Sequence, residues 1–293
     1  MTPETLELRL PQVTLSALAW GPADGPLVVA LHGFPDTAHA WRHLGPFLAG
    51  HGYRVVAPYL RGYAPSAVPD DGCFHVAALM ADAAAVHEVL GGGEDAVLVG
   101  HDWGAITAHG LGAHPRSPYR RIVAMAVPPL PTMDGAGPRL LARQARNSWY
   151  VGFNQLPLLP ERTLPRLVRR LWRDWSPGHD ASEDLPHVLA ALDAPANRHA
   201  AVGYYRAIRA PWAVPAAYRD WKRTWAGTPT VPTLYLHGAD DGCLHPGFAT
   251  GVEAKLPLGG SRAVTVPGAG HFLQVEQPDA VHAHVLEFLT NGP

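Results

Sequence analysis

Short apolar segments alternate with longer amphipathic ones through the first 127 residues of the chain. Apolar, β-branched runs bounded by glycine or proline are typical of strands buried on both faces, and they predict strands at 27–31, 53–57, 96–99 and 122–127. Residues 75–90 form the clearest predicted helix, because apolar side chains recur there every three or four positions and Gly91–Gly93 follows them. This alternation favours an α/β fold with a mostly parallel sheet flanked by helices.

The pattern changes after residue 127. Prolines and glycines crowd residues 128–138, which is typical of a linker, and the segment up to residue 228 has helical periodicity, no clear strand and six of the nine tryptophans. Strand patterns return at 233–236 and 263–266, and a last helix fits 278–289. We therefore predict a core domain, residues 1–127 and 229–293, with an inserted all-helical lid, residues 128–228. An aromatic lid suits a cover over a pocket, although most of these rings are also expected to pack the lid itself.

Composition narrows the class of protein. The 293 residues carry a formal net charge of −2, so no basic excess is present to hold nucleic acid. Two cysteines far apart, Cys73 and Cys243, indicate neither a disulfide framework nor a thiolate metal site. The first residues do not resemble a signal peptide, and the apolar runs are strand-sized, so we expect a cytoplasmic protein that does not cross a membrane.

The most informative motif is the segment Gly100–Gly104, which reads Gly-His-Asp-Trp-Gly after a predicted strand and before a predicted helix. Small residues on both sides of a central residue suit a sharp turn that lifts one side chain clear of the sheet. A serine usually occupies that position, and here it is Asp102. A carboxylate can displace a leaving group at saturated carbon and form an alkyl ester, and the start of a helix favours its ionised form. An aspartate at this place also serves as an ordinary helix N-cap.

Candidates for a general base and its orienting acid follow two later strands. His271 lies in a glycine-rich loop after the strand that ends at Val266, and Asp240 and Asp241 follow the strand that ends near His237. The spacing from Gly238 favours Asp241 as the acid. The order Asp102, Asp241, His271 is nucleophile, acid and base, as expected for this architecture.

Backbone donors and metal ligands complete the residue-level predictions. The segment His32–Pro35 follows another strand, so the N–H groups of Phe34 and Trp103 are candidates for an oxyanion hole. His39 and His43 lie four residues apart without the accompanying carboxylate of a metal motif, so we expect neither a metal nor a cofactor.

Together these motifs resemble the α/β-hydrolase superfamily, specifically its branch with an aspartate nucleophile, the epoxide hydrolases and related dehalogenases. The resemblance covers nearly the whole chain and rests on four motifs in the expected order: His32–Pro35, Gly100–Gly104, Gly238–Asp241 and Gly268–His271. One departure is Tyr59, where such enzymes usually have an aspartate before Leu-Arg-Gly. That aspartate has a structural role, so the departure does not affect the expected catalysis.

The resemblance also implies two lid tyrosines that hold and protonate the epoxide oxygen. Residues 147–150 and 203–208 look like the two tyrosine segments, which assigns Tyr150 and Tyr205, with Tyr204 in reserve. We expect the substrate pocket to be lined by Phe34, Trp103, Trp149 and Phe272, and the substrate to be an apolar or aryl epoxide. A monomer or homodimer is expected.

Three other functions compete with epoxide hydrolysis. A haloalkane dehalogenase uses the same triad of nucleophile, acid and base but needs two N–H donors to bind its halide. Trp103 could provide one donor, but Phe34 occupies the position where the second donor is usually an asparagine or a similar residue. A haloacid dehalogenase needs an arginine beside the nucleophile, where Trp103 stands. A non-catalytic ligand receptor on the same fold has little need for Asp241 behind His271.

Overall fold

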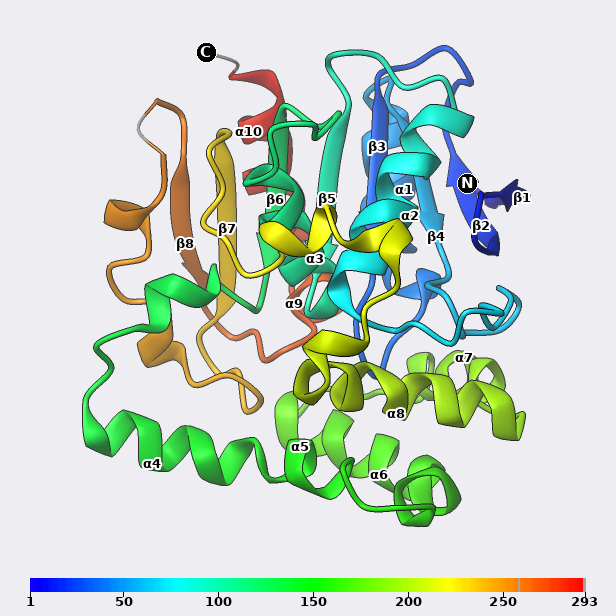
Figure 1. Cartoon of the computed structure of the whole chain (residues 1–293). Helices are drawn as coiled ribbons and strands as arrows, with labels where there is room; N and C mark the ends of the chain where they lie inside the picture. Colours follow the sequence, from blue (N-terminus) through cyan, green and yellow to red (C-terminus); the bar gives the residue numbers. More distant parts are fainter. Residues whose placement is uncertain (258, 292–293) are drawn as a thin grey trace.

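A single sheet forms the centre of the protein in the computed structural model, which describes residues 1–257 and 259–291. Its eight strands lie in the order β1-β2-β4-β3-β5-β6-β7-β8 (Figure 1). β1 and β2 pair antiparallel with each other, β2 pairs antiparallel with β4, and the remaining neighbours are parallel. The strands are β1 (Glu4–Arg9), β2 (Thr14–Trp20), β3 (Leu27–Leu31), β4 (Arg54–Pro58), β5 (Val97–His101), β6 (Arg121–Met125), β7 (Thr233–Gly238) and β8 (Arg262–Val266).

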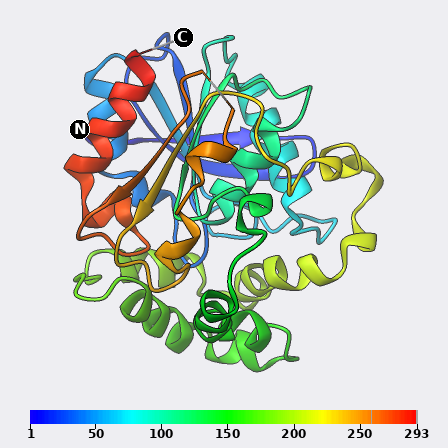
Figure 2. The ribbon, with the colours of Figure 1, turned by 90° about the vertical axis from the view of Figure 1, so that its left-hand side faces the viewer.

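Helices cover both faces of this sheet (Figures 1 and 2). α2 (Val76–Val89) and α3 (Trp103–Gly112) pack on one face, and α1 (Leu44–Gly50) and α10 (Pro278–Thr290) pack on the other. Consecutive strand residues point to opposite faces, so Val28 and Val29 belong to two different buried apolar clusters. This burial on both sides explains why the central strands are continuous apolar runs, and the predicted α/β fold with a mostly parallel sheet is confirmed.

The predicted central strands and the two predicted core helices are present, with ends that move by a few residues. β6 stops at Met125, earlier than expected, because Ala126 has a positive φ of 68°. The apolar pattern predicts no strand before Leu27, whereas the structure has the hairpin β1–β2 there. Its residues alternate between exposed and buried, a weaker signal than a continuous apolar run.

The segment between β6 and β7 is helical. Its main helices gather at one end of the sheet, at the bottom of Figures 1 and 2, and they are α4 (Pro138–Asn147), α5 (Trp149–Phe153), α6 (Leu159–Trp175), α7 (Asp184–Ala191) and α8 (Pro195–Arg209). The indole N–H of Trp172 in α6 donates to the carbonyl of Pro35, just after β3, at 2.8 Å. These helices therefore cover the carboxyl ends of the parallel strands.

Short elements complete the chain: α9 (Leu273–Glu276) and the 3₁₀ turns η1 (Ala38–Trp41), η2 (Leu130–Met133), η3 (Pro211–Ala213), η4 (Ala216–Tyr218), η5 (Trp221–Arg223), η6 (Pro246–Phe248) and η7 (Glu253–Lys255). Within the described residues, no helix has the length and apolar character needed to cross a membrane.

A buried ion pair anchors the loop after β4. The guanidinium of Arg61 is fully buried and donates to both carboxylate oxygens of Asp82 in α2, at 2.7 and 2.6 Å. A third bond joins Arg61 to the carbonyl of Cys73 at 2.8 Å. Because each charge is buried, either one would be costly without the other.

We expect Asp82→Ala to lower the free energy of unfolding by about 3–5 kcal/mol, since it removes the carboxylate that is hydrogen-bonded to the buried Arg61 and leaves only the partly exposed Asp71, 3.7 Å away, as an ionic partner among the described residues. Asp174→Ala is the matched control: that carboxylate also pairs with arginines, but on the surface, where a pair contributes at most about 1 kcal/mol. Urea unfolding of both variants measures the difference. Equal losses in the two variants would contradict this account of Arg61.

Candidate active site

Asp102 lies at the turn between β5 and α3. Its φ of 52° is in the left-handed region, which is uncommon for a residue with a side chain. The flanking glycines permit the turn, because a Cβ on Gly100 would collide with the Gly104 carbonyl and one on Gly104 with the Leu31 carbonyl. The carboxylate makes no capping hydrogen bond to α3. Asp102 is therefore not an ordinary side-chain N-cap.

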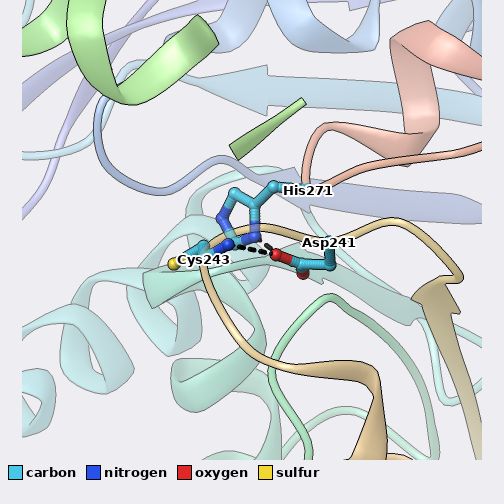
Figure 3. Close-up of side chains that lie close together, drawn as sticks. All are labelled: Asp241, Cys243 and His271. Carbon is cyan, nitrogen blue, oxygen red and sulfur yellow. Dashed lines mark hydrogen bonds and ion pairs between the residues drawn. The ribbon is translucent and has the colours of Figure 1, made fainter. Parts of the chain in front are cut away.

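His271 and Asp241 lie in the loops that follow β8 and β7, and the imidazole of His271 lies between the two carboxylates of Asp241 and Asp102. The Nδ1 atom of His271 lies 3.0 Å from Oδ2 of Asp241 (Figure 3), and its Nε2 atom lies 3.8 Å from Oδ2 of Asp102. Asp240 is exposed. Of the two neighbouring acids, the structure thus brings Asp241 to the imidazole, because the carboxyl ends of adjacent parallel strands meet at one edge of the sheet.

The backbone fixes the orientation of both carboxylates. Oδ1 of Asp241 accepts hydrogen bonds from the N–H groups of Cys243 at 2.7 Å and Leu244 at 3.0 Å, which leaves Oδ2 for His271. Oδ1 of Asp102 accepts from the N–H of Phe34 at 2.7 Å. Gly33 is required beside it, since a Cβ there would overlap the Asp102 carboxylate. The two oxygens of Asp102 therefore have different surroundings: Oδ1 faces a backbone donor and Oδ2 faces the imidazole.

Burial and charge set the protonation of this group. Burial raises the pKa of Asp102 to about 6, against the opposite influence of the His271 charge and of the N–H groups of Phe34 and Trp103. Burial also disfavours the imidazolium form of His271, but the charge and hydrogen bond of Asp241 raise its pKa well above the usual range. Near neutral pH the arrangement favours an ionised Asp102 beside a charged His271.

Two tyrosines from the helical segment between β6 and β7 face this group. The rings of Tyr150 and Tyr205 are buried and meet edge to face at 5.5 Å, and Tyr205 also contacts Phe34 and Trp103. The Tyr205 hydroxyl has no hydrogen-bond partner among the described residues, and the Tyr150 hydroxyl lies 3.5 Å from Sγ of Cys243. The hydroxyl of Tyr204 donates to the Arg61 carbonyl at 2.9 Å. Of the two neighbouring tyrosines, the structure therefore turns Tyr205 toward Asp102.

Three of the four side chains expected around the substrate are buried beside the triad. Phe34 and Trp103 adjoin Asp102, and the ring of Phe272 contacts that of His271 at 5.2 Å. Trp149 is outside this group: 36% of it is exposed, and Arg170 lies over its ring at 4.4 Å. Neighbouring residues of a helix point in different directions, so the residue after it, Tyr150, points inward instead.

Trp175, in α6, occupies the place expected of Trp149, with its ring 4.9 Å from the rings of Tyr150 and His271. Trp172, one turn earlier, stacks on Phe272 at 3.6 Å. These two tryptophans therefore join the helical segment between β6 and β7 to the site. No local sequence signal separates them from the others, since the contact depends on how α6 docks.

Three further residues that the sequence analysis did not assign hold or touch the site. The hydroxyl of Ser176 accepts from the N–H groups of His271 at 3.1 Å and Phe272 at 3.3 Å. Nε2 of His101 lies 2.9 Å from the carbonyl oxygen of His271. Cys243 is buried against Tyr150. The positions of His101 inside the Gly100–Gly104 motif and of Cys243 two residues after Asp241 are the signals that could have identified them.

Comparisons with known proteins agree with this geometry. The family model described as alpha/beta hydrolase fold matches residues 26–278. The chain is 31% identical to Epoxide hydrolase A of Mycobacterium tuberculosis, over 95% of this chain and 94% of that protein. It is 30% identical to the AB hydrolase superfamily protein YfhM of Bacillus subtilis, over 95% of each. Among solved structures, Epoxide Hydrolase A from Mycobacterium thermoresistibile superposes with a TM-score of 0.79 at 27% identity, over 99% of both chains.

Proposed function

The chain belongs to the α/β-hydrolase fold family, and from this premise we propose that it is an epoxide hydrolase, which opens an epoxide to a vicinal diol through an ester on Asp102. In the first step Oδ2 of Asp102 attacks a ring carbon from the side opposite the C–O bond. That bond breaks, and its electron pair goes to the epoxide oxygen. The product of this step is an alkyl ester of Asp102 with a neighbouring alcohol.

The observation that carries the proposal is the pair of buried tyrosine hydroxyls beside a carboxylate nucleophile. Burial raises the pKa of both tyrosines well above the usual range, and the nearby Asp102 charge adds to this effect. Tyr150 and Tyr205 therefore stay protonated near neutral pH. They can hydrogen-bond the epoxide oxygen and give a proton to the alkoxide that forms, which is a much stronger base than they are.

The second step hydrolyses the ester. Once Asp102 is alkylated it loses its negative charge, so the imidazole 3.8 Å away loses a partner that stabilises its charged form. His271 can then give its proton to the tyrosinate left by the first step and act as a base toward water, oriented by Asp241. The imidazole takes one proton of the water as its oxygen attacks the ester carbonyl, and the developing charge on Oδ1 is stabilised by the N–H groups of Phe34 and Trp103. The intermediate then collapses, the departing diol oxygen takes the other proton of the water, and the carboxylate is restored.

The direct test is turnover of an aryl epoxide such as styrene oxide. We expect a vicinal diol from the purified protein. One observation favours the competing dehalogenase reaction, since the buried indole N–H of Trp103 has no hydrogen-bond partner within the described part of the chain and could hold a halide. Halide release from a 1-haloalkane, without diol formation from any epoxide, would favour that alternative and overturn the proposal.

Adjacent tyrosines in α8 provide a matched pair of variants. We expect Tyr205→Phe to lower kcat/KM for an epoxide by about 100-fold, because it removes a proton donor to the leaving oxygen. Tyr204→Phe should leave kcat/KM nearly unchanged and cost about 1 kcal/mol of stability, since its hydroxyl donates to the Arg61 carbonyl and to no other group of the described residues. Steady-state kinetics and thermal unfolding of both variants decide the point. A larger kinetic loss for Tyr204→Phe would reverse the assignment.

Several broader expectations are part of the same proposal. We propose residues 128–228 as the lid and residues 1–127 with 229–293 as the core, with the lid helices closing the site from the side of α6 and α8. An apolar or aryl epoxide suits a site walled by Phe34, Trp103 and Phe272. A cofactor-free reaction, a monomer or homodimer, and a cytoplasmic location remain predictions.

A further inference from the structure

Cys243 is a buried thiol inside the site to which the proposed reaction assigns no task. It follows Asp241 by two residues, and its N–H donates to Oδ1 of that aspartate at 2.7 Å. Its Sγ atom lies 3.5 Å from the Tyr150 hydroxyl. The thiol, the acid and the base therefore converge in one small volume (Figure 3).

We propose that Asp241, Cys243 and His271 form a binding site for a thiophilic divalent cation, Zn²⁺ or Cd²⁺. A carboxylate oxygen, the sulfur and an imidazole nitrogen all lie within 4.8 Å of one another, and all three residues are buried. The Nδ1 atom of His271 is the nitrogen that faces Asp241, at 3.0 Å from its Oδ2 atom. A thiol, an imidazole and a carboxylate together are a ligand set that these cations prefer.

Charge and size both suit such an ion. A thiolate and a carboxylate together carry two negative charges, which neutralise a divalent cation in a buried place where an unbalanced charge would be costly. Binding releases two protons to solvent, one from the thiol and one from the charged imidazole of His271, and changes no oxidation state. Tetrahedral zinc sites separate their ligand atoms by about 3.5 Å, so side-chain movements of about 1 Å complete the coordination.

A cation bound there inhibits the enzyme, an inference that rests on the proposed function. It occupies the imidazole that has to activate water, and it withdraws Asp241 from its orienting role. Because Cys243 also adjoins Tyr150, the ion lies beside the group that binds the epoxide oxygen. The site therefore makes epoxide hydrolysis sensitive to thiophilic metals.

Titration of the full-length, metal-free protein with Cd²⁺ tests binding without any substrate. The readout is the ultraviolet charge-transfer absorption of a cadmium–thiolate bond. Cys73 is the matched control, because it is the only other cysteine and is also buried, beside Arg61. We expect the wild type and Cys73→Ser to develop the band at one Cd²⁺ per chain, and Cys243→Ser to lack it. Absence of the band in the wild type, or its persistence in Cys243→Ser, would overturn the proposal.

Inhibition is measured on the same proteins with an accepted epoxide. We expect Cd²⁺ and Zn²⁺ to inhibit the wild type and Cys73→Ser, EDTA to restore their activity, and Cys243→Ser to need at least about tenfold more metal. Each variant is compared with its own metal-free rate. A Cd²⁺ band without inhibition would refute the inhibitory role. If the metal-free wild type hydrolysed no epoxide, the proposed function would be refuted. The absorption titration would still show whether Cd²⁺ binds at Cys243, because it needs no substrate.

Discussion

Replacement of His271 by glutamine is expected to stop the reaction at the ester on Asp102. Attack on the epoxide needs the carboxylate of Asp102 and the two tyrosines, and all three remain in this variant. Hydrolysis of the ester needs a base, and a glutamine amide cannot remove a proton from water. Turnover should therefore fall by at least about 10³-fold, while one equivalent of substrate becomes bound. Mass spectrometry of the intact protein should show an increase equal to the mass of the epoxide.

Peptide mapping sharpens this experiment. The added mass should lie on the peptide that contains Asp102 and disappear after mild alkaline hydrolysis, as expected of an ester. Asp240→Ala is a suitable control, because this exposed acid neighbours Asp241 without touching the imidazole, and it should turn over normally and accumulate no adduct. If His271→Gln lost activity without an adduct, His271 would be needed for the first step, and the two-step scheme would fail.

Replacement of Asp102 by alanine is expected to abolish both steps, with a loss of at least about 10⁴-fold in kcat. Without the carboxylate no covalent intermediate can form, so this variant should also show no mass increase with an epoxide. A companion measurement follows the oxygen. In a single turnover of the wild type in heavy-oxygen water, the new hydroxyl of the diol should carry unlabelled oxygen from Asp102, and the label should enter the carboxylate. Label in the first diol formed would show direct attack by water instead.

The thermal stability of Asp102→Ala is the control for its expected loss of activity. A carboxyl whose pKa rises on folding, as that of Asp102 does to about 6, favours the folded state only while it is protonated. At neutral pH it is mainly ionised, so its burial opposes folding there. We expect Asp102→Ala to unfold at the same temperature as the wild type or at a higher one. A clearly lower melting temperature would mean that the lost activity reflects a damaged fold.

The sequence was sufficient to locate the central strands and to select Asp102, Asp241 and His271, which the structure brings together, because each depends on local constraints. Strands buried on both faces must be apolar at every position, so a short continuous run is visible without tertiary information. The turn at Asp102 needs glycines at positions 100 and 104, and the structure shows the collisions that any Cβ would cause there. In contrast, the edge hairpin β1–β2 is half exposed, and its alternating pattern is a weaker signal of a strand than a continuous apolar run.

The contacts of the helical segment between β6 and β7 were less predictable, because they join residues distant along the chain. Tyr204 and Tyr205 are indistinguishable by pattern, and only the rotation of α8 against the core sends one hydroxyl to the Arg61 carbonyl and leaves the other facing Asp102. The same holds for Trp149 and Trp175, whose roles depend on how α5 and α6 dock. Ser176 contacts the His271 loop across 95 residues of sequence.

What the sequence determined by itself is the chemistry at the strand ends: a carboxylate on a tight turn, with an acid and an imidazole following in order. Each of these side chains is placed by a few neighbouring residues of its own strand and loop. What only the tertiary structure decided is which side chains of α5, α6 and α8 face that carboxylate, and that the thiol of Cys243 lies beside one of them, Tyr150. Those placements depend on how whole helices pack, and packing arises from many weak contacts that no short segment encodes.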